Sequence, residues 1–315
     1  MAEFNYQNRR DFLKLVFGTA IINSGFALHA QNDFIKKGIT KITILYTNDV
    51  HSRIEAFPSN DPKFAGLGGF AERAKLINQI RSEEKNVLLL DAGDVFQGTP
   101  YFNFYSGELE FKLMSSMGYD CMTLGNHDFD LGLDNIVKQM QHASFSIINC
   151  NYNFENTGLK NKIKPYRVII KDGIRIGILG VGIELAGLVP KNLYQETMHE
   201  NPFDKVNEFS KILTHDEKCD YIICLSHLGY TSENKKPNDQ LLAKETENID
   251  LIIGGHTHTF LEQPVLIKNK KNKNVMVTQV GWAGIWLGRI DVLIDKNNFG
   301  ITSHASKNII KTSRV

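Results

Sequence analysis

The sequence predicts an α/β fold within one domain, and three observations lead to this prediction. From residue 41 onwards, short runs of β-branched and aliphatic residues alternate with longer stretches of helical pattern, which is typical of sheets covered by helices. The run Val87-Leu88-Leu89-Leu90 is apolar at every position, as expected for a strand buried on both faces. Residues 40–300 contain no internal repeat, low-complexity tract or linker.

The individual elements follow from this alternation. A strand is expected wherever about four to eight apolar or β-branched residues stand between turn residues. We expect strands at residues 42–46, 87–90, 121–124, 146–149, 167–170, 174–181, 221–225, 251–253, 275–280 and 286–294. Helices are expected at residues 70–80, 99–117, 131–141, 203–213 and 238–247. Between two apolar runs, a basic cluster indicates a solvated hairpin loop: Lys268, Lys270, Lys271 and Lys273.

The first thirty residues are set apart from the fold as an export signal. Arg9 and Arg10 precede Phe12, an apolar run covers residues 15–28, and Ala30 follows. This order is typical of a secretory signal, and the apolar run is too short to cross a bilayer comfortably. The paired arginines resemble a twin-arginine signal, which predicts a periplasmic or exported protein. An ordinary secretory signal and an uncleaved anchor stay open as alternatives.

The composition excludes several classes of protein. The chain of 315 residues is 42% hydrophobic and 23% charged, which is ordinary for a globular protein. Its formal charge is +1, and it becomes zero without residues 1–30, which argues against a nucleic-acid polymer as partner. No later stretch reaches the length of a membrane span. The four cysteines show no spacing signature and are expected to be buried small hydrophobes: Cys121, Cys150, Cys219 and Cys224.

Polar side chains gather just beyond the ends of five predicted strands. The segments concerned are residues 48–51, 91–98, 125–130, 226–229 and 254–258. Ligands of open α/β sheets bind at the carboxyl ends of strands, so we expect these segments to form one site. Asp49 and His51, like His256 and His258, are two residues apart, which would place each pair on one face of an extended segment.

The side chains of these segments suit transition metals. Imidazole nitrogens combined with carboxylate and amide oxygens favour Mn, Fe, Co or Zn over magnesium or calcium. A carboxylate such as Asp94 can bridge two cations, and two cations about 3.5–4 Å apart can clamp the attacking and leaving oxygens of a phosphoryl transfer. The sequence therefore predicts a site for two divalent cations whose identity stays open.

Four motifs also carry a family resemblance. They occur in order between about residues 41 and 295: Thr47-Asn48-Asp49-x-His51, Gly93-Asp94-x-x-Gln97-Gly98-Thr99-Pro100, Gly125-Asn126-His127-Asp128-Phe129-Asp130 and Gly254-Gly255-His256-Thr257-His258. Together they resemble calcineurin-like metallophosphoesterases. Within that family, the segments Gln97-Gly98-Thr99-Pro100 and Phe129-Asp130 resemble the 5′-nucleotidase branch.

The resemblance implies a fold and a set of site residues. The fold would be a four-layer α/β/β/α sandwich with two mixed sheets. One cation would be bound by Asp49, His51, Asp94 and His258, and the other by Asp94, Asn126, His227 and His256. His127 and Asp130 would form the catalytic dyad, with a hydroxide that bridges the cations as the nucleophile. The alternative for Asp130 is a helix cap for the residues from 131 onwards.

Other residues are expected to have supporting or structural roles. Asp91 would support the ligands by hydrogen bonding, and Gln97 would either do the same or occupy a turn. Four histidines outside the motifs are expected at the surface: His142, His199, His215 and His304. Four apolar residues are expected in the core: Phe102, Phe104, Phe111 and Met114.

These inferences predict a metal-dependent phosphoester hydrolase acting on a small phosphorylated substrate, a nucleotide by resemblance. Residues 31–315 would form its catalytic domain. Full-length 5′-nucleotidases continue into a second domain that grips the nucleoside, and no segment of this chain resembles that domain. Its supply by a separate chain is a further hypothesis. The alternatives are a non-catalytic or partner-dependent metal-binding subunit and a sulfur-ester hydrolase of similar fold.

Overall fold

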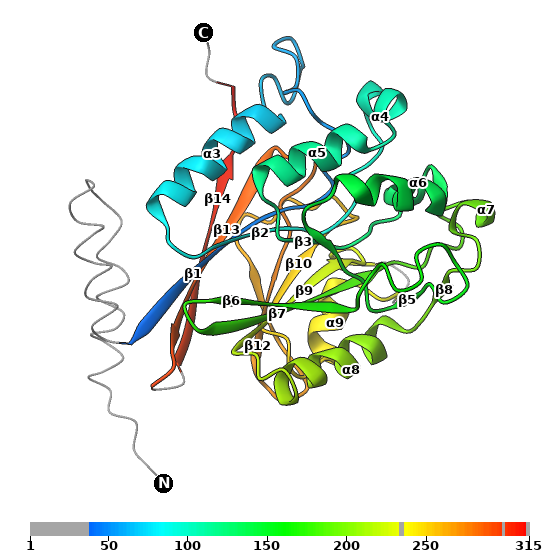
Figure 1. Ribbon diagram of the computed structural model, residues 1–315. Helices are drawn as coiled ribbons and strands as arrows, with labels where there is room; N and C mark the ends of the chain where they lie inside the picture. The colour runs from blue at the N-terminus through cyan, green and yellow to red at the C-terminus, as the bar shows by residue number, and fades with distance from the viewer. Residues whose placement is uncertain (1–37, 233–235, 298–299, 313–315) are drawn as a thin grey trace. The chain divides into compact units, whose positions relative to one another are not determined.

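The computed structural model describes residues 38–232, 236–297 and 300–312 (Figure 1). By its internal contacts the chain divides into two compact units. The larger unit comprises Lys41–Val292 and Thr302–Val315, and it holds all the site segments. The smaller comprises Met1–Thr40 and Leu293–Ile301. The predicted export signal, residues 1–30, lies outside the described residues.

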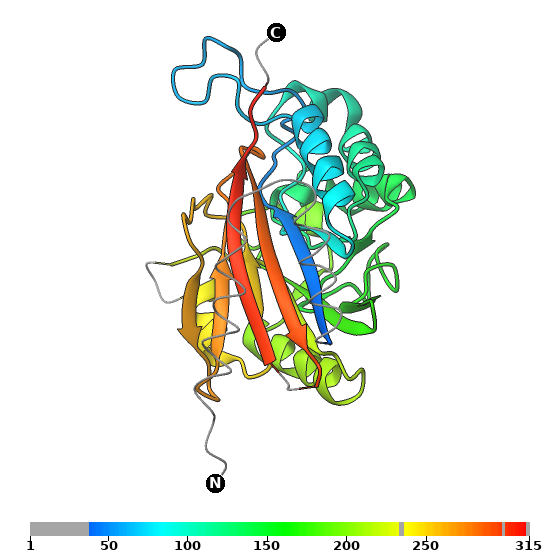
Figure 2. The ribbon, with the colours of Figure 1, turned by 90° about the vertical axis from the view of Figure 1, so that its left-hand side faces the viewer.

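The first sheet has six strands in the order β14-β13-β1-β2-β3-β4. They are β1 (Ile39–Thr47), β2 (Val87–Asp91), β3 (Cys121–Met122), β4 (Ser146–Ile147), β13 (Trp286–Asp295) and β14 (Gly300–Ile309). Figure 2 shows β1, β13 and β14 side by side. The pairs β1–β2, β2–β3 and β3–β4 are parallel. Thr47 pairs with Asp91, and Asp91 pairs with Met122, so these strands end at one edge of the sheet.

The second sheet also has six strands, in the order β11-β12-β10-β9-β7-β6. They are β6 (Tyr166–Lys171), β7 (Ile174–Gly182), β9 (Tyr221–His227), β10 (Leu251–Gly254), β11 (Val265–Lys268) and β12 (Asn274–Thr278). The strands β7, β9, β10 and β12 run parallel, whereas β6 and β11 are antiparallel to their neighbours. A separate two-stranded ribbon pairs β5 (Tyr152–Asn153) with β8 (Met198–His199).

Helices cover one face of each sheet. They are α3 (Phe70–Glu83), α4 (Pro100–Tyr105), α5 (Glu108–Met117), α6 (Gly132–Gln139), α7 (Lys191–Tyr194), α8 (Pro202–His215) and α9 (Asp239–Glu245). One core cluster joins apolar residues of α3, α5 and α6 to the first sheet, and another joins α8 and α9 to the second (Figure 1). Between the sheets, the hydroxyls of Tyr46 and Thr278 lie 2.7 Å apart. The predicted α/β/β/α arrangement with two mixed sheets is confirmed.

Most predicted elements are present, but the helix expected over residues 99–117 is two helices. The chain turns at Ser106 (φ 55°) and Gly107 (φ 95°) between α4 and α5. A Cβ atom at Gly107 would lie 2.3 Å from the Phe96 ring, so only glycine fits this close approach. The core prediction for Phe104 is wrong, because this residue of α4 is 82% exposed. The other three residues predicted for the core are buried: Phe102, Phe111 and Met114.

Smaller predictions have mixed outcomes. The lysine cluster lies in the β11–β12 hairpin, as predicted. All four cysteines are free thiols, and all but Cys219 are fully buried. His215 and His304 are exposed, as predicted, whereas His142 and His199 are partly buried. Within the described ranges, no helix combines the length and apolar character that a membrane span requires.

Candidate metal centre

The predicted ligands meet at facing strand ends of the two sheets. Each of the seven follows or ends a strand: Asp49 and His51 after β1, Asp94 after β2, Asn126 after β3, His227 at the end of β9, and His256 and His258 after β10. All but His256 and His258 are buried. The structure therefore brings together side chains from segments that are far apart in the sequence.

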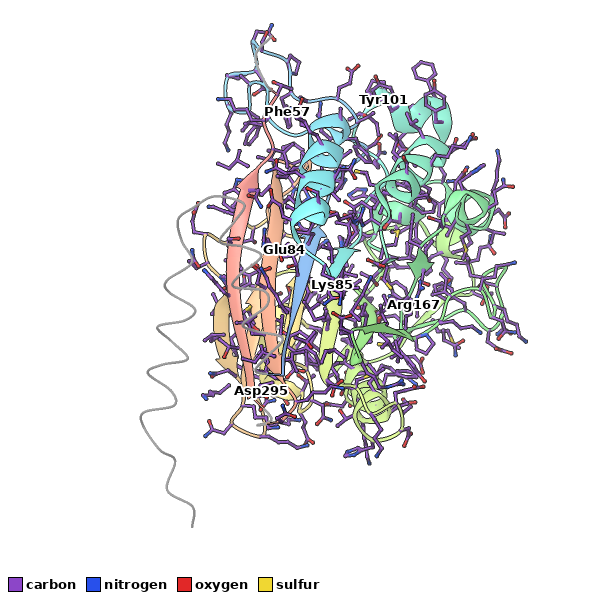
Figure 3. All side chains as sticks on the ribbon, turned by 60° about the vertical axis from the view of Figure 1, so that its left-hand side comes forward. Phe57, Glu84, Lys85, Tyr101, Arg167 and Asp295 are labelled. Carbon is purple, nitrogen blue, oxygen red and sulfur yellow. The ribbon has the colours of Figure 1, made fainter. Side chains whose placement is uncertain are left out.

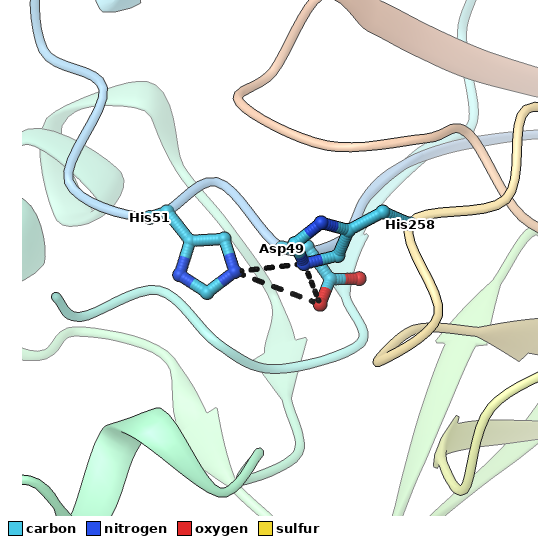
Figure 4. A group of neighbouring side chains, drawn as sticks. All are labelled: Asp49, His51 and His258. Carbon is cyan, nitrogen blue, oxygen red and sulfur yellow. Dashed lines mark hydrogen bonds and ion pairs between the residues drawn. The ribbon is translucent and has the colours of Figure 1, made fainter. Parts of the chain in front are cut away.

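Asp49, His51 and His258 form the first group (Figure 4). The Nε2 atoms of the two histidines are 3.0 Å apart. Asp49 Oδ1 lies 3.3 Å from His258 Nε2 and 3.9 Å from His51 Nε2. Two imidazole nitrogens directed at one carboxylate oxygen are a donor set that suits a transition-metal cation.

Asp94, His227 and His256 form the second group. His227 Nε2 is buried without a hydrogen bond, although it lies 3.1 Å from Asp94 Oδ2. Its Nδ1 is 2.7 Å from the Ala92 carbonyl oxygen, a contact that fixes the ring with Nε2 toward the site. Asn126 Oδ1 lies 2.9 Å from His256 Nδ1. An orphaned buried nitrogen beside carboxylate and amide oxygens fits a divalent cation.

Asp94 connects the two groups. Its Oδ2 atom is 3.1 Å from His227 Nε2 and 3.8 Å from His51 Nε2, so one carboxylate reaches both. Its Oδ1 atom accepts a 2.8 Å hydrogen bond from the backbone N–H of His127. Asp94 is thus placed to bridge two cations. Asp49 Oδ1 also lies 3.9 Å from His227 Nε2, but it is closer to His258 of its own group.

The ligand segments are not extended, contrary to the prediction from residue spacing. Positive φ angles occur at five ligands: Asp49 (49°), His51 (48°), Asp94 (56°), His256 (72°) and His258 (51°). Such left-handed backbone costs roughly 1–2 kcal/mol per residue outside glycine. Strained backbone of this kind is concentrated at functional sites. The ligand side chains are therefore brought together by tight turns and not by the periodicity of a strand.

Asp128 fixes the loops that carry Asp94 and Asn126. This buried carboxylate accepts four backbone N–H groups, from Asp94, Val95, Phe96 and Gly125, at 2.8–3.1 Å. Burial raises the pKa of Asp128 to about 7. Sequence reasoning gave Asp128 no role, because hydrogen bonds to the backbone of another loop leave no spacing signature.

Asp91 and Gln97 act on local backbone. Asp91 accepts hydrogen bonds from the Gly93 N–H at 2.8 Å and from the Thr47 hydroxyl at 2.5 Å, which steadies the turn before Asp94. Gln97 has a φ of 64° and its Oε1 accepts the Gly98 N–H, so its contacts match the turn alternative.

Gln279 and Val280, which lie outside every motif, brace both groups. The Val280 N–H donates to the Asn48 side chain at 2.9 Å, and Asn48 in turn donates to Asp49 Oδ2 at 2.6 Å. The Gln279 amide donates to the Gly255 carbonyl and accepts from Thr257 Oγ1 and the Thr259 N–H. Gln279 directly follows β12, so the strand-end rule could have found it.

His127 and Asp130 lie beside the first group. His127 Nδ1 is 2.8 Å from Asp130 Oδ2, and the His127 ring lies 5.3 Å from the His51 ring between centroids. The hydrogen bond to Asp130 raises the pKa of His127, while partial burial opposes the rise. Helix α6 begins after Leu131 without a side-chain cap, so Asp130 does not act as the alternative helix cap.

The charges of the second group are strongly coupled. Burial alone would lower the pKa of His227, but the Asp94 and Asp49 carboxylates raise it to about 10. Burial and then the charge on His227 lower the pKa of His256 to about 4. In the protein without cations, the neighbouring carboxylates therefore favour the protonated form of His227 at neutral pH.

Comparison with known proteins identifies the family. The calcineurin-like phosphoesterase model matches residues 42–260. The chain therefore belongs to the calcineurin-like phosphoesterases. These are metal-dependent phosphoric ester hydrolases that use two divalent metal ions.

Individual relatives point to the 5′-nucleotidase branch. The snake venom 5′-nucleotidase of Crotalus adamanteus is 31% identical over 307 residues, which cover 89% of this chain and 48% of that protein. The 5′-nucleotidase precursor of Thermus thermophilus superposes with a TM-score of 0.79 at 29% identity, over 86% of this chain and 55% of that one. The phosphoesterase YfkN of Bacillus subtilis superposes with a TM-score of 0.70 at 25% identity, over 88% of this chain and 93% of that one.

The similarity covers one part of the longer relatives. The chain spans about half the length of the curated 5′-nucleotidases it matches. The catalytic fold resembles the N-terminal domain of 5′-nucleotidases.

Proposed function

We propose that this protein hydrolyses nucleoside monophosphates by two-metal chemistry. The observation that carries the proposal is the position of Asp94, whose single carboxylate reaches both histidine-containing groups. The relatives named as 5′-nucleotidases support a nucleotide substrate. Export through the twin-arginine signal stays a prediction.

The chain's residues divide into ligands and proton-handling groups. Asp49, His51 and His258 would hold one cation, Asn126, His227 and His256 the other, and Asp94 both. When bound, two such cations activate a water molecule near neutral pH and neutralise charge on the phosphoryl oxygens. Because the protein fixes these carboxylates and imidazoles, the two cations would be in place before the substrate binds.

His127 would act on the leaving oxygen. With its Nδ1–H donated to Asp130, its Nε2 is the nitrogen available to substrate, and the side chain is 43% exposed. The hydrogen bond to Asp130 raises the pKa of His127, which favours the protonated form. A protonated imidazole at this position stabilises the developing negative charge or donates its proton to the departing alkoxide.

A substrate panel tests the proposal. The full chain, supplemented with Mn²⁺, is assayed with AMP, a cyclic nucleotide, an aryl phosphate and a thiosulfate ester, and its metal content is measured. We expect two cations per chain and hydrolysis of AMP. Two bound cations without turnover of any ester would indicate a metal-binding subunit. Turnover of the thiosulfate ester alone would indicate a sulfur-ester hydrolase. Either result overturns the proposal.

A further inference from the structure

Trp282 stacks on a predicted ligand although it belongs to no motif. It lies in the connection between β12 and β13. Its ring is parallel to the His258 imidazole within 5°, with the centroids 5.7 Å apart. We propose that Trp282 is a positioning residue that fixes the imidazole plane of His258, and with it the cation affinity of the Asp49–His51–His258 group. The inference rests on the ligand set of the proposed function.

His258 needs such support because its ring is weakly held. A metal-binding histidine usually donates its second ring N–H to a fixed acceptor. His227 Nδ1 has the Ala92 carbonyl at 2.7 Å, and His51 Nδ1 has the Phe96 carbonyl at 3.4 Å. The His258 ring differs. Among the described residues, its Nε2 contacts His51 Nε2, and its Nδ1 has no hydrogen-bond partner. Its side chain is also 39% exposed.

The stacked tryptophan is itself well braced. The rings of Phe57 and Phe64 meet Trp282 edge-on, with centroids 5.8 and 5.9 Å away. Figure 3 places Phe57 in the loop that follows β1. On either side of Trp282, the Gly281 carbonyl accepts from Asn48 at 2.6 Å, and the Ala283 N–H donates to the Asp49 carbonyl at 2.7 Å.

These contacts join two ligands through one residue. The backbone around Trp282 is fixed to the Asn48–Asp49 segment, whereas its indole lies on His258. The indole therefore holds His258 in a fixed position relative to Asp49, although the two ligands are far apart in the sequence. An aromatic ring can replace the indole in this role, but a flexible aliphatic side chain cannot fix a ring plane.

Cation binding to three variants tests this inference. In metal-stripped full-length Trp282→Leu, calorimetric titration with Mn²⁺ should show one of the two cations bound about tenfold more weakly, in line with changes to residues that orient metal ligands. Trp282→Phe should restore the affinity. As a matched control, Trp286→Leu should leave both affinities unchanged, because Trp286 packs on Phe260 and Lys307 rather than on a ligand.

Fluorescence provides a second readout, since the chain has only two tryptophans. In Trp286→Phe, Co²⁺ should quench the emission of Trp282; in Trp282→Phe, the emission of Trp286 should change little. If Trp282→Leu and Trp282→Phe bind both cations with equal affinity, the inference is wrong while the proposed function stands. If the wild-type protein binds no cation, the ligand set fails, and both proposals fall with it.

Discussion

At the scale of single residues, His127 is the proposed proton donor to the leaving oxygen. Replacing His127 with glutamine removes the charged donor but keeps the bulk of the side chain. We expect turnover of AMP to fall about 10²–10⁴-fold, with both cations retained. Hydrolysis of an activated aryl phosphate should fall less, because its leaving group needs no proton. Full activity of His127→Gln on AMP would contradict the role.

The proton held by His227 predicts a pH dependence of cation binding. Below its pKa of about 10, His227 is protonated in the protein without cations, and a ligand must lose its proton to bind metal. His256, with its pKa lowered to about 4, adds no proton near neutral pH. The affinity of the second group should therefore rise with pH between about 6 and 9, by roughly tenfold per unit.

Calorimetry in buffers of different ionisation enthalpy measures this proton release directly. About one proton should leave for the cation bound at the second group. An affinity that stays constant over the same pH range, with no proton released, would contradict the displacement of a proton from His227 by a cation.

At the scale of elements, Asp128 joins the loops after β2 and β3. Asp128→Ala would leave four backbone N–H groups without an acceptor. Each unsatisfied buried group costs about 1–3 kcal/mol, and partial solvation would offset some of the sum, so we expect the free energy of unfolding to fall by about 4 kcal/mol in urea denaturation. The exposed Asp134 of α6 provides the control, since Asp134→Ala should cost less than about 0.5 kcal/mol. Equal stability of the two variants would refute this role for Asp128.

Predictability from sequence differs between elements for physical reasons. Apolar runs locate the buried strands because burial on both faces leaves no polar position, as in the first four residues of β2. The break between α4 and α5 depends on the approach of Gly107 to the Phe96 ring, a tertiary contact that no local pattern records. Phe104 lies in the short helix α4, of which Phe102 is the buried residue.

The same distinction applies to the candidate site. The residues predicted as ligands are adjacent because they occupy strand ends, which topology brings together. Their left-handed backbone and the backbone contacts of Asp128 could not be predicted, since these depend on loops meeting in three dimensions. Gln279, in contrast, directly follows β12, so the strand-end rule applied to that strand could have found it.

At the scale of the whole molecule, the site connects the two sheets. The Asp49 carboxylate, after β1, accepts the backbone N–H of His256, after β10, at 3.0 Å. Cations held by ligands from both sheets would add further links across the same interface. Binding to the native state alone stabilises a protein by about 2.7 kcal/mol at a ligand concentration about 100 times Kd.

Chelation should therefore lower the thermal midpoint without unfolding the protein, because a buried apolar core also holds the helices to each sheet. Calorimetric scans with EDTA and with excess Mn²⁺ measure the difference. Asp94→Asn should show a much smaller response to Mn²⁺. An identical midpoint in both conditions for the wild-type protein would contradict cation binding across the sheets.

The most direct test of the account is the electron paramagnetic resonance spectrum of the protein loaded with two equivalents of Mn²⁺. Two ions that share the Asp94 carboxylate, about 3.5–4 Å apart, should give the multiline spectrum of an exchange-coupled pair. Asp94→Asn should lose that coupling. A wild-type spectrum of isolated Mn²⁺ ions at full occupancy would contradict a shared two-metal site.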